Sequence, residues 1–172
     1  MVQVDFSNIA ISDSSQIVSA TLYMKNYDFE ASGDHVDIFR VKTDWGPGSS
    51  TYGSEAQDGE VTWSHAKYNQ VAWSTAGCND SNDRETSAED TETIDSQGAW
   101  YSWDVTTSAR TMFSSGNYYG WILILQEEDD GTQNKIRFCS SEYDVGADYS
   151  KRPYLEITYA PEPVLDQIRY RW

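Results

Sequence analysis

Short stretches in which apolar and polar residues alternate recur along the whole chain, separated by residues that form turns. The clearest runs from Ile17 to Tyr27 ("IVSATLYMKNY"), where Val18, Ala20, Leu22 and Met24 fall on one face of an extended strand and are expected to point inward. An all-β chain accounts for this pattern, because period-two alternation is typical of half-buried strands. The predicted strands are Val2–Phe6, Ile17–Tyr27, His35–Val41, Glu60–Trp63, Ala99–Val105, Tyr119–Gln126, Asn134–Ser140 and Pro153–Tyr159.

One segment departs from the β pattern. In "DVTTSARTMFSSGN", Val105, Ala109, Met112 and Phe113 recur at the spacing of a helix face. The spacing predicts a short helix over Thr107–Ser114 that lies across the end of a β-sandwich. Asp104 or Thr106 is expected to cap its start, and Gly116 to end it.

Two stretches are predicted to be loops. Residues Trp73–Gln97 form a long acidic segment, and a loop of that length is usually functional or disordered. Asp130-Gly131 predicts a tight hairpin turn. The length of 172 residues suits one domain over residues 1–160, followed by an extension over residues 161–172.

The charge excludes several classes of partner. Asp and Glu total 28 against 12 Lys and Arg, which gives a formal net charge of −16. We therefore expect no nucleic acid and no anionic membrane surface as partner, since both need a positive footprint. No apolar run is long enough to cross a bilayer, and "MVQVDFSNIA" lacks the pattern of a signal peptide. Export would then follow from a removed signal, another route, or carriage on a particle such as a virion.

The two cysteines leave their redox state open. Cys78 lies in a polar loop and Cys139 in a predicted strand. Two cysteines are too few to define a disulfide framework, so a bond and two free thiols both fit.

The C-terminal segment repeats the strand pattern after the sandwich is complete. Ile168, Tyr170 and Trp172 alternate with Arg169 and Arg171. An unpaired strand is a liability, so we expect this segment to pair with a sheet edge, beside Val2–Phe6, in its own domain or in a neighbour. The alternative is that it begins a further domain.

Several stretches carry a resemblance to a known family. They are "VQVDFSNI", "IVSATLYM", "VDIFRVKTDW", "EVTWSHA", "WYSWDVTTSAR", "NYYGWILIL", "IRFCSSE" and "RPYLEITY". In this order they resemble the DNRLRE family, also called disaggregatase-related domains, which overlaps a family of carbohydrate-binding modules. The resemblance implies an antiparallel jelly-roll-like β-sandwich without catalytic activity, carried on secreted, cell-surface or viral proteins. Such domains usually start with one more strand, whereas Met1 here directly precedes Val2, so that strand is expected to be missing.

No arrangement of residues predicts catalysis. The two histidines, His35 and His65, lie in neither a nucleophile elbow nor a zinc-binding motif. Ser64 beside His65 is adjacency in sequence, which does not define geometry. We therefore expect a non-enzymatic protein.

Calcium is the one metal that the sequence suggests. Residues 79–90 weakly resemble a calcium-binding loop, but Arg84 stands where the sharp turn needs glycine. A solvated acidic loop explains the segment as well. The expected ligands of a calcium ion are Asp80, Asp83 and Asp95.

Aromatic residues suggest sugar recognition, since exposed rings stack on sugars. Trp45 and Tyr52 flank a glycine-rich loop, and parity along Ala99–Val105 turns Trp100 outward and Trp103 inward. We expect Trp45, Tyr52 and Trp100 to bind a glycan. The rings expected in the core are Trp63, Trp73, Trp103 and Trp121.

Two functions follow from these features. The first is an extracellular or surface carbohydrate-binding module, for which neutral glycans suit the negative charge better than acidic ones. The second is a structural subunit of a virion, filament or cell-surface layer, joined through its C-terminal strand.

Overall fold

The long strand β1 (Ile17–Phe29) organises the first of the two antiparallel sheets that form the sandwich. It pairs along one side with β6 (Trp100–Asp104) and along the other with β9 (Tyr154–Tyr159) and β8 (Ile136–Phe138). This computed structural model describes residues 1–4, 6, 9, 11–29, 33–49, 54–126, 135–143, 146 and 148–160. The predicted turn at Asp130-Gly131 and the C-terminal segment 161–172 lie outside those residues.

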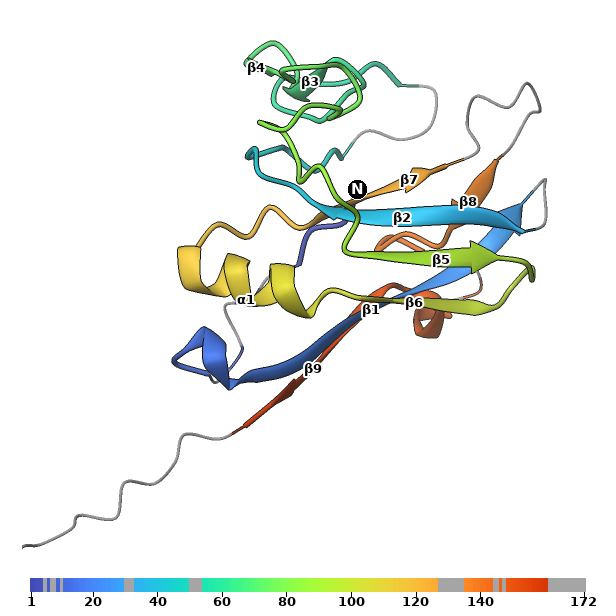
Figure 1. Cartoon of the computed structure of the whole chain (residues 1–172). Coiled ribbons are helices and arrows are strands. Elements are labelled where there is room, and N and C mark those ends of the chain that lie inside the picture. The colour runs from blue at the N-terminus through green and yellow to red at the C-terminus, as the bar shows by residue number, and fades with distance from the viewer. Residues whose placement is uncertain are drawn as a thin grey trace, which may run out of the picture.

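The second sheet has the order β5 (Asp90–Ile94), β2 (Asp34–Arg40) and β7 (Trp121–Leu125). The two sheets form separate layers, with the main core between them (Figure 1). Trp103 lies in that core and donates a hydrogen bond from Nε1 to the carbonyl oxygen of Val36 across the layers at 3.0 Å. The predicted all-β sandwich is confirmed, whereas the jelly-roll connection stays a prediction.

The helix α1 (Thr106–Ser115) covers one end of the sandwich and confirms the predicted helix to within a residue at each end. Ser108, Ala109 and Met112 are its buried residues. Gly116 ends it in the left-handed conformation, at φ 72°, and its N–H bonds to the carbonyl oxygen of Met112. Within the described part of the chain, no helix has the length and apolarity of a membrane span.

Two short 3-10 helices accompany these elements, η1 (Ser14–Gln16) just before β1 and η3 (Tyr149–Lys151) just before β9. Asp13 caps η1 by accepting a hydrogen bond from the Ser15 N–H at 2.7 Å. The cap fixes the turn through which the chain enters β1.

A small lobe carries β3 (His65–Lys67) and β4 (Val71–Ala72) and lies on the other side of β2 and β7 from β5 (Figure 1). It has its own buried cluster, which is made by Val41, Trp45, Ala66, Trp73 and Cys78. The predicted strand Glu60–Trp63 is wrong, because the chain bends at Trp63 before β3 begins. Trp63 is also not a core residue, since it is 72% exposed.

Three further predictions, of one loop and two strands, are corrected. The segment Trp73–Gln97 contains β5, whose polar alternation marks a sheet edge. Among residues 1–4 and 6, which the structure describes, Val2 alone forms a bridge, to Trp121, while Phe6 is buried without strand pairing. Val18 is exposed and Ile17 buried, because a register irregularity lies between Ile17 and Ser19.

The two cysteines are free and buried in different places. Cys78 lies in the core of the lobe, whereas the N–H of Cys139 bonds to the carbonyl oxygen of Lys25 in the first sheet. Of the two states that the sequence left open, the structure therefore has free thiols.

Burial of Cys78 predicts a loss of stability at alkaline pH. Burial, and then the negative charge of Asp83, raise the pKa of this thiol from 9.0 to about 11. Between these values the unfolded chain releases the proton and the folded chain keeps it, so stability falls as pH rises. We expect Cys78→Ala to remove a decrease of order 2 kcal/mol between about pH 8 and pH 11, measured by urea unfolding. Cys139→Ala is the control, which should keep the decrease.

Candidate functional site: an aromatic face on the first sheet

The outer face of the first sheet carries three aromatic side chains in adjoining positions. In register, Tyr23 of β1 lies opposite Tyr154 of β9, and Lys25 lies opposite Trp100 of β6. Alternation turns Leu22 and Met24 inward, so these four side chains share the solvent side. We call Tyr23, Trp100 and Tyr154, with Lys25, the aromatic face.

The three rings of the aromatic face contact one another. Tyr23 and Tyr154 stack with their centroids 4.7 Å apart and their planes 11° apart. Trp100 meets Tyr154 edge to face at 5.4 Å. Trp100 is 37% exposed and Tyr154 is 48% exposed, so the cluster offers aromatic surface to a ligand while its own contacts hold it in place.

Polar groups border the rings. Nζ of Lys25 lies 5.5 Å from the ring centroid of Trp100 and donates a hydrogen bond to the carbonyl oxygen of Gly98 at 2.7 Å. Ser102 is in register with Tyr23, and Glu156 follows Tyr154 by two positions on the same face of β9. Ammonium, hydroxyl and carboxylate groups beside aromatic rings are the partners that sugar hydroxyls need.

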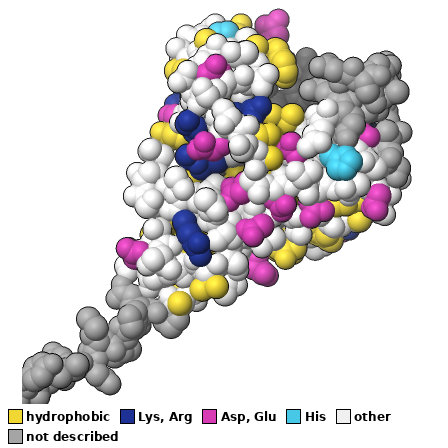
Figure 2. Space-filling view, viewed as in Figure 1, with side chains coloured by type: hydrophobic (Ala, Val, Ile, Leu, Met, Phe, Trp, Pro, Cys, Tyr) yellow, Lys and Arg dark blue, Asp and Glu magenta, His cyan; other side chains and the backbone are white. Residues whose placement is uncertain are grey.

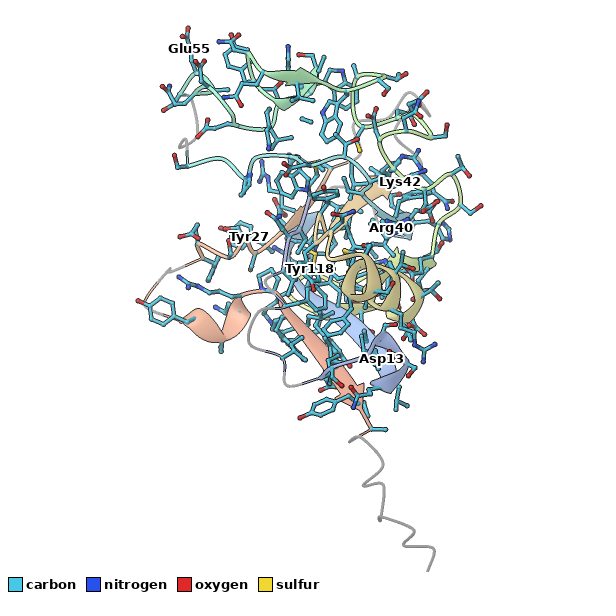
Figure 3. The ribbon with its side chains drawn as sticks, turned by 90° about the vertical axis from the view of Figure 1, so that its left-hand side faces the viewer. Asp13, Tyr27, Arg40, Lys42, Glu55 and Tyr118 are labelled. Atoms are coloured by element: carbon cyan, nitrogen blue, oxygen red, sulfur yellow. The ribbon has the colours of Figure 1, made fainter. Side chains whose placement is uncertain are left out.

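A second pair of rings continues along β1. Tyr27 lies 6.4 Å from Tyr143, and Nζ of Lys151 lies 5.5 Å from the centroid of Tyr143. In Figure 3, Tyr27 is on the side of the sandwich away from Arg40. The aromatic surface therefore extends beyond the first three rings, toward the end of β1.

The three residues that were predicted to bind a glycan differ in where they lie. Trp100 lies on the exposed outer face, as its parity predicted. Trp45 does not offer a stacking surface, because it is only 5% exposed and its Nε1 donates to the carbonyl oxygen of Tyr119 at 2.6 Å. Its indole anchors the lobe to the chain that enters β7. Tyr52 lies outside the described residues.

Sequence reasoning missed Tyr23 and Tyr154 as members of one site. Their parity was readable, since Tyr23 alternates with Leu22 and Met24, and Tyr154 alternates with Leu155. The missing information was the pairing of β1 with both β6 and β9, which joins residues more than 130 positions apart.

The three predicted calcium ligands do not form one group. Asp83 precedes Arg84, which forms a β-bridge with Val41 just after the end of β2. Asp95 follows Ile94, which pairs with Asp34 at the start of β2. Seven residues of β2 separate these two levels, or about 23 Å. Asp80 accepts hydrogen bonds from Asn82, and Asp95 accepts one from the hydroxyl of Tyr101. Among the described residues, no three His, Cys, Asp or Glu side chains gather as metal ligands do.

Acidic side chains gather on another part of the surface, over the middle of the view in Figure 2. Burial, and then the charge of Asp90, raise the pKa of Glu92 on β5. Asp90 is also close to the other sheet, since its Oδ2 accepts a hydrogen bond from the Asp104 N–H at 2.7 Å. This edge of the sandwich therefore repels anions.

Ser64 and His65 are in hydrogen-bond contact, with 2.8 Å between Oγ and Nδ1. The His65 ring meets Tyr68 edge to face at 5.6 Å. Both side chains lie in the lobe, on the chain that enters β3. The expectation of a non-enzymatic protein stays a prediction.

Comparison of the chain with protein families, curated proteins and solved structures finds no match. The resemblance to the DNRLRE family therefore stays a prediction, and the function proposed below rests on the geometry of the aromatic face.

Proposed function

We propose that this protein is a non-catalytic carbohydrate-binding module that acts outside the cell or at the surface of a cell or particle. The observation that supports it most directly is the contact of Tyr23, Trp100 and Tyr154 on a solvent-facing sheet. Large aromatic side chains are ordinarily buried, and a group of exposed ones marks a binding surface. A sheet face suits an extended chain of sugars, because its side chains are held by the strands beneath them.

The charge of the chain narrows the ligand. With a net charge of −16, the domain repels polymers of uronic acids or sulfated sugars. Neutral hexose and pentose polymers avoid this repulsion, and they offer hydroxyl groups to Lys25, Ser102 and Glu156. The proposal requires no metal ion at the aromatic face. The predicted calcium is a separate matter, which titration of the protein with calcium would test.

Substitution of the exposed rings tests this proposal. On a panel of neutral and acidic glycans, Trp100→Ala and Tyr154→Ala should each weaken binding of a neutral glycan about tenfold, which corresponds to about 1.4 kcal/mol. Isothermal titration calorimetry gives the affinity. The melting temperature should fall by only a few degrees, at about 2–4 °C for each kcal/mol in a domain of this size.

The matched control is Trp63→Ala, which removes an exposed indole from the lobe. It should leave glycan affinity unchanged. The proposal fails if no neutral glycan binds, or if Trp63→Ala weakens binding as much as Trp100→Ala does.

A further inference from the structure

The outer edge of β7 is paired only at its first residue in the part of the chain that the structure describes. Val2 and Trp121 exchange two antiparallel backbone hydrogen bonds, each of 2.8 Å. On the other side of the strand, Gly120 accepts from the Val41 N–H, and Gln126 donates to the His35 carbonyl oxygen. By this alternation, the backbone N–H and C=O groups of Leu123 and Leu125 point to the outer edge of β7, on the same side as those of Trp121.

An apolar groove of about 1190 Å³ lies along this edge and extends from the lobe, at Trp45 and Trp63, past β7 and β8 to Tyr154. Leu123 and Leu125 form one wall, Ile136 and Phe138 form the other, and Leu22 and Met24 lie between them. The four wall residues are only partly buried, although they pack against the main core. An unpaired strand edge beside partly buried apolar side chains is the arrangement that accepts an added strand.

We propose that this groove binds residues 164–172 of a second copy of this chain as a strand antiparallel to β7. In that segment Ile168, Tyr170 and Trp172 alternate with Arg169 and Arg171. An added strand places the first set in the groove and the second set in solvent, where two arginines face a chain of net charge −16. This inference does not rest on glycan binding, although Tyr154 of the aromatic face also lines the groove.

The geometry of β9 favours a second copy over the chain's own tail. Tyr159 pairs with Ile17 at the end of the sandwich that α1 covers, where Arg110 bonds to the Ile17 carbonyl oxygen at 2.7 Å. β7 also begins there, since Trp121 Nε1 donates to Ser108 of α1 at 2.6 Å. A tail that enters the groove from this end runs parallel to β7 and first meets the stretch that Val2 occupies. The tail of another molecule enters from the opposite end, in the antiparallel direction that the Val2 bridge sets.

Complementation between two full-length variants tests the proposal. Leu125→Arg blocks the groove and keeps the tail, whereas the double variant Tyr170→Asp, Trp172→Asp disables the tail and keeps the groove. By sedimentation velocity, the unaltered chain should self-associate with rising concentration, and each variant alone should be monomeric. An equimolar mixture should form a heterodimer, because each lacks what the other supplies. A monomeric unaltered chain, self-association that both variants retain, or a mixture that stays monomeric would each overturn the proposal.

A peptide of residues 164–172 provides a second readout that does not need Leu125→Arg to fold. It should bind the tail variant, and the same peptide with Tyr170→Asp should bind about tenfold more weakly or worse. Arg171→Gln in the peptide is the matched control, because its side chain faces solvent, and it should bind nearly as well as the original. Equal affinity for all three peptides, or no binding at all, contradicts the proposal. Glycan affinity should be the same in the two monomeric variants, which keeps the two proposals separately testable.

Discussion

Replacement of Trp103 by alanine should destabilise the protein by about 3–5 kcal/mol, the largest effect that we expect from a single core substitution. Trp103 is fully buried, meets Phe138 edge to face at 5.8 Å, and bonds to Val36 of the opposite sheet. The substitution removes the indole volume and also the hydrogen bond that joins the two layers. Urea unfolding followed by far-UV circular dichroism gives the free-energy change.

Two other substitutions separate the contributions at this position. Trp103→Phe keeps an aromatic ring in the core but loses the hydrogen bond to Val36. It should therefore cost less than Trp103→Ala, and the lost hydrogen bond should account for about 1 kcal/mol of its cost. Trp63→Ala removes the same side chain from an exposed position and should cost much less than Trp103→Ala. Similar losses for Trp63→Ala and Trp103→Ala would contradict the described core.

Gly120→Ala should cost about 3 kcal/mol and free the N-terminal segment from β7. Gly120 has φ 71°, which strains any residue with a Cβ by about 1–2 kcal/mol. An added Cβ would also lie 2.0 Å from the Val2 carbonyl oxygen and 2.9 Å from Gln3 Cα. The backbone there must move, so the two Val2–Trp121 hydrogen bonds are lost, at about 1 kcal/mol each.

Gly116→Ala is the matched control for this prediction. Gly116 has nearly the same φ, 72°, and a Cβ there would meet nothing within 4 Å. Its cost should therefore be the backbone strain alone, about 1–2 kcal/mol. Hydrogen exchange should show the Trp121 amide protected in Gly116→Ala and unprotected in Gly120→Ala. If both variants lose the same free energy and keep that protection, the close approach of Val2 to Gly120 is wrong.

The packing of Phe6 extends this view of the N-terminal segment. Phe6 is buried and stacks on Tyr118 at 5.1 Å, and Tyr118 lies near the middle of the molecule in Figure 3. Sequence alternation predicted a paired strand over Val2–Phe6, but in the described part of that segment the bridge from Val2 to Trp121 and side-chain packing hold the chain instead. The segment does alternate in polarity, but tertiary contacts determined that it packs against the core rather than forming a paired strand.

In the candidate site, too, one feature was predictable from the sequence and another was not. The outward direction of Trp100 followed from parity along β6, because neighbouring residues of a strand point to opposite faces. The burial of Trp45 did not follow from its place before a glycine-rich loop. It depends on the lobe, where Trp45 packs beside Trp73 and Cys78 in a second core.

The sequence by itself determined the class of fold, the place of α1, and the direction of strand residues such as Leu22, Trp100 and Trp103. These features depend on local periodicity, which a short window of the chain contains in full. Only the tertiary structure decided that Tyr23, Trp100 and Tyr154 meet, that Asp83 and Asp95 lie apart, and that a groove runs along the edge of β7 where Val2 pairs with Trp121. Those outcomes depend on which strands pair and in which register. Strand pairing is decided by contacts between segments that lie far apart in the sequence, and local periodicity contains no information about it.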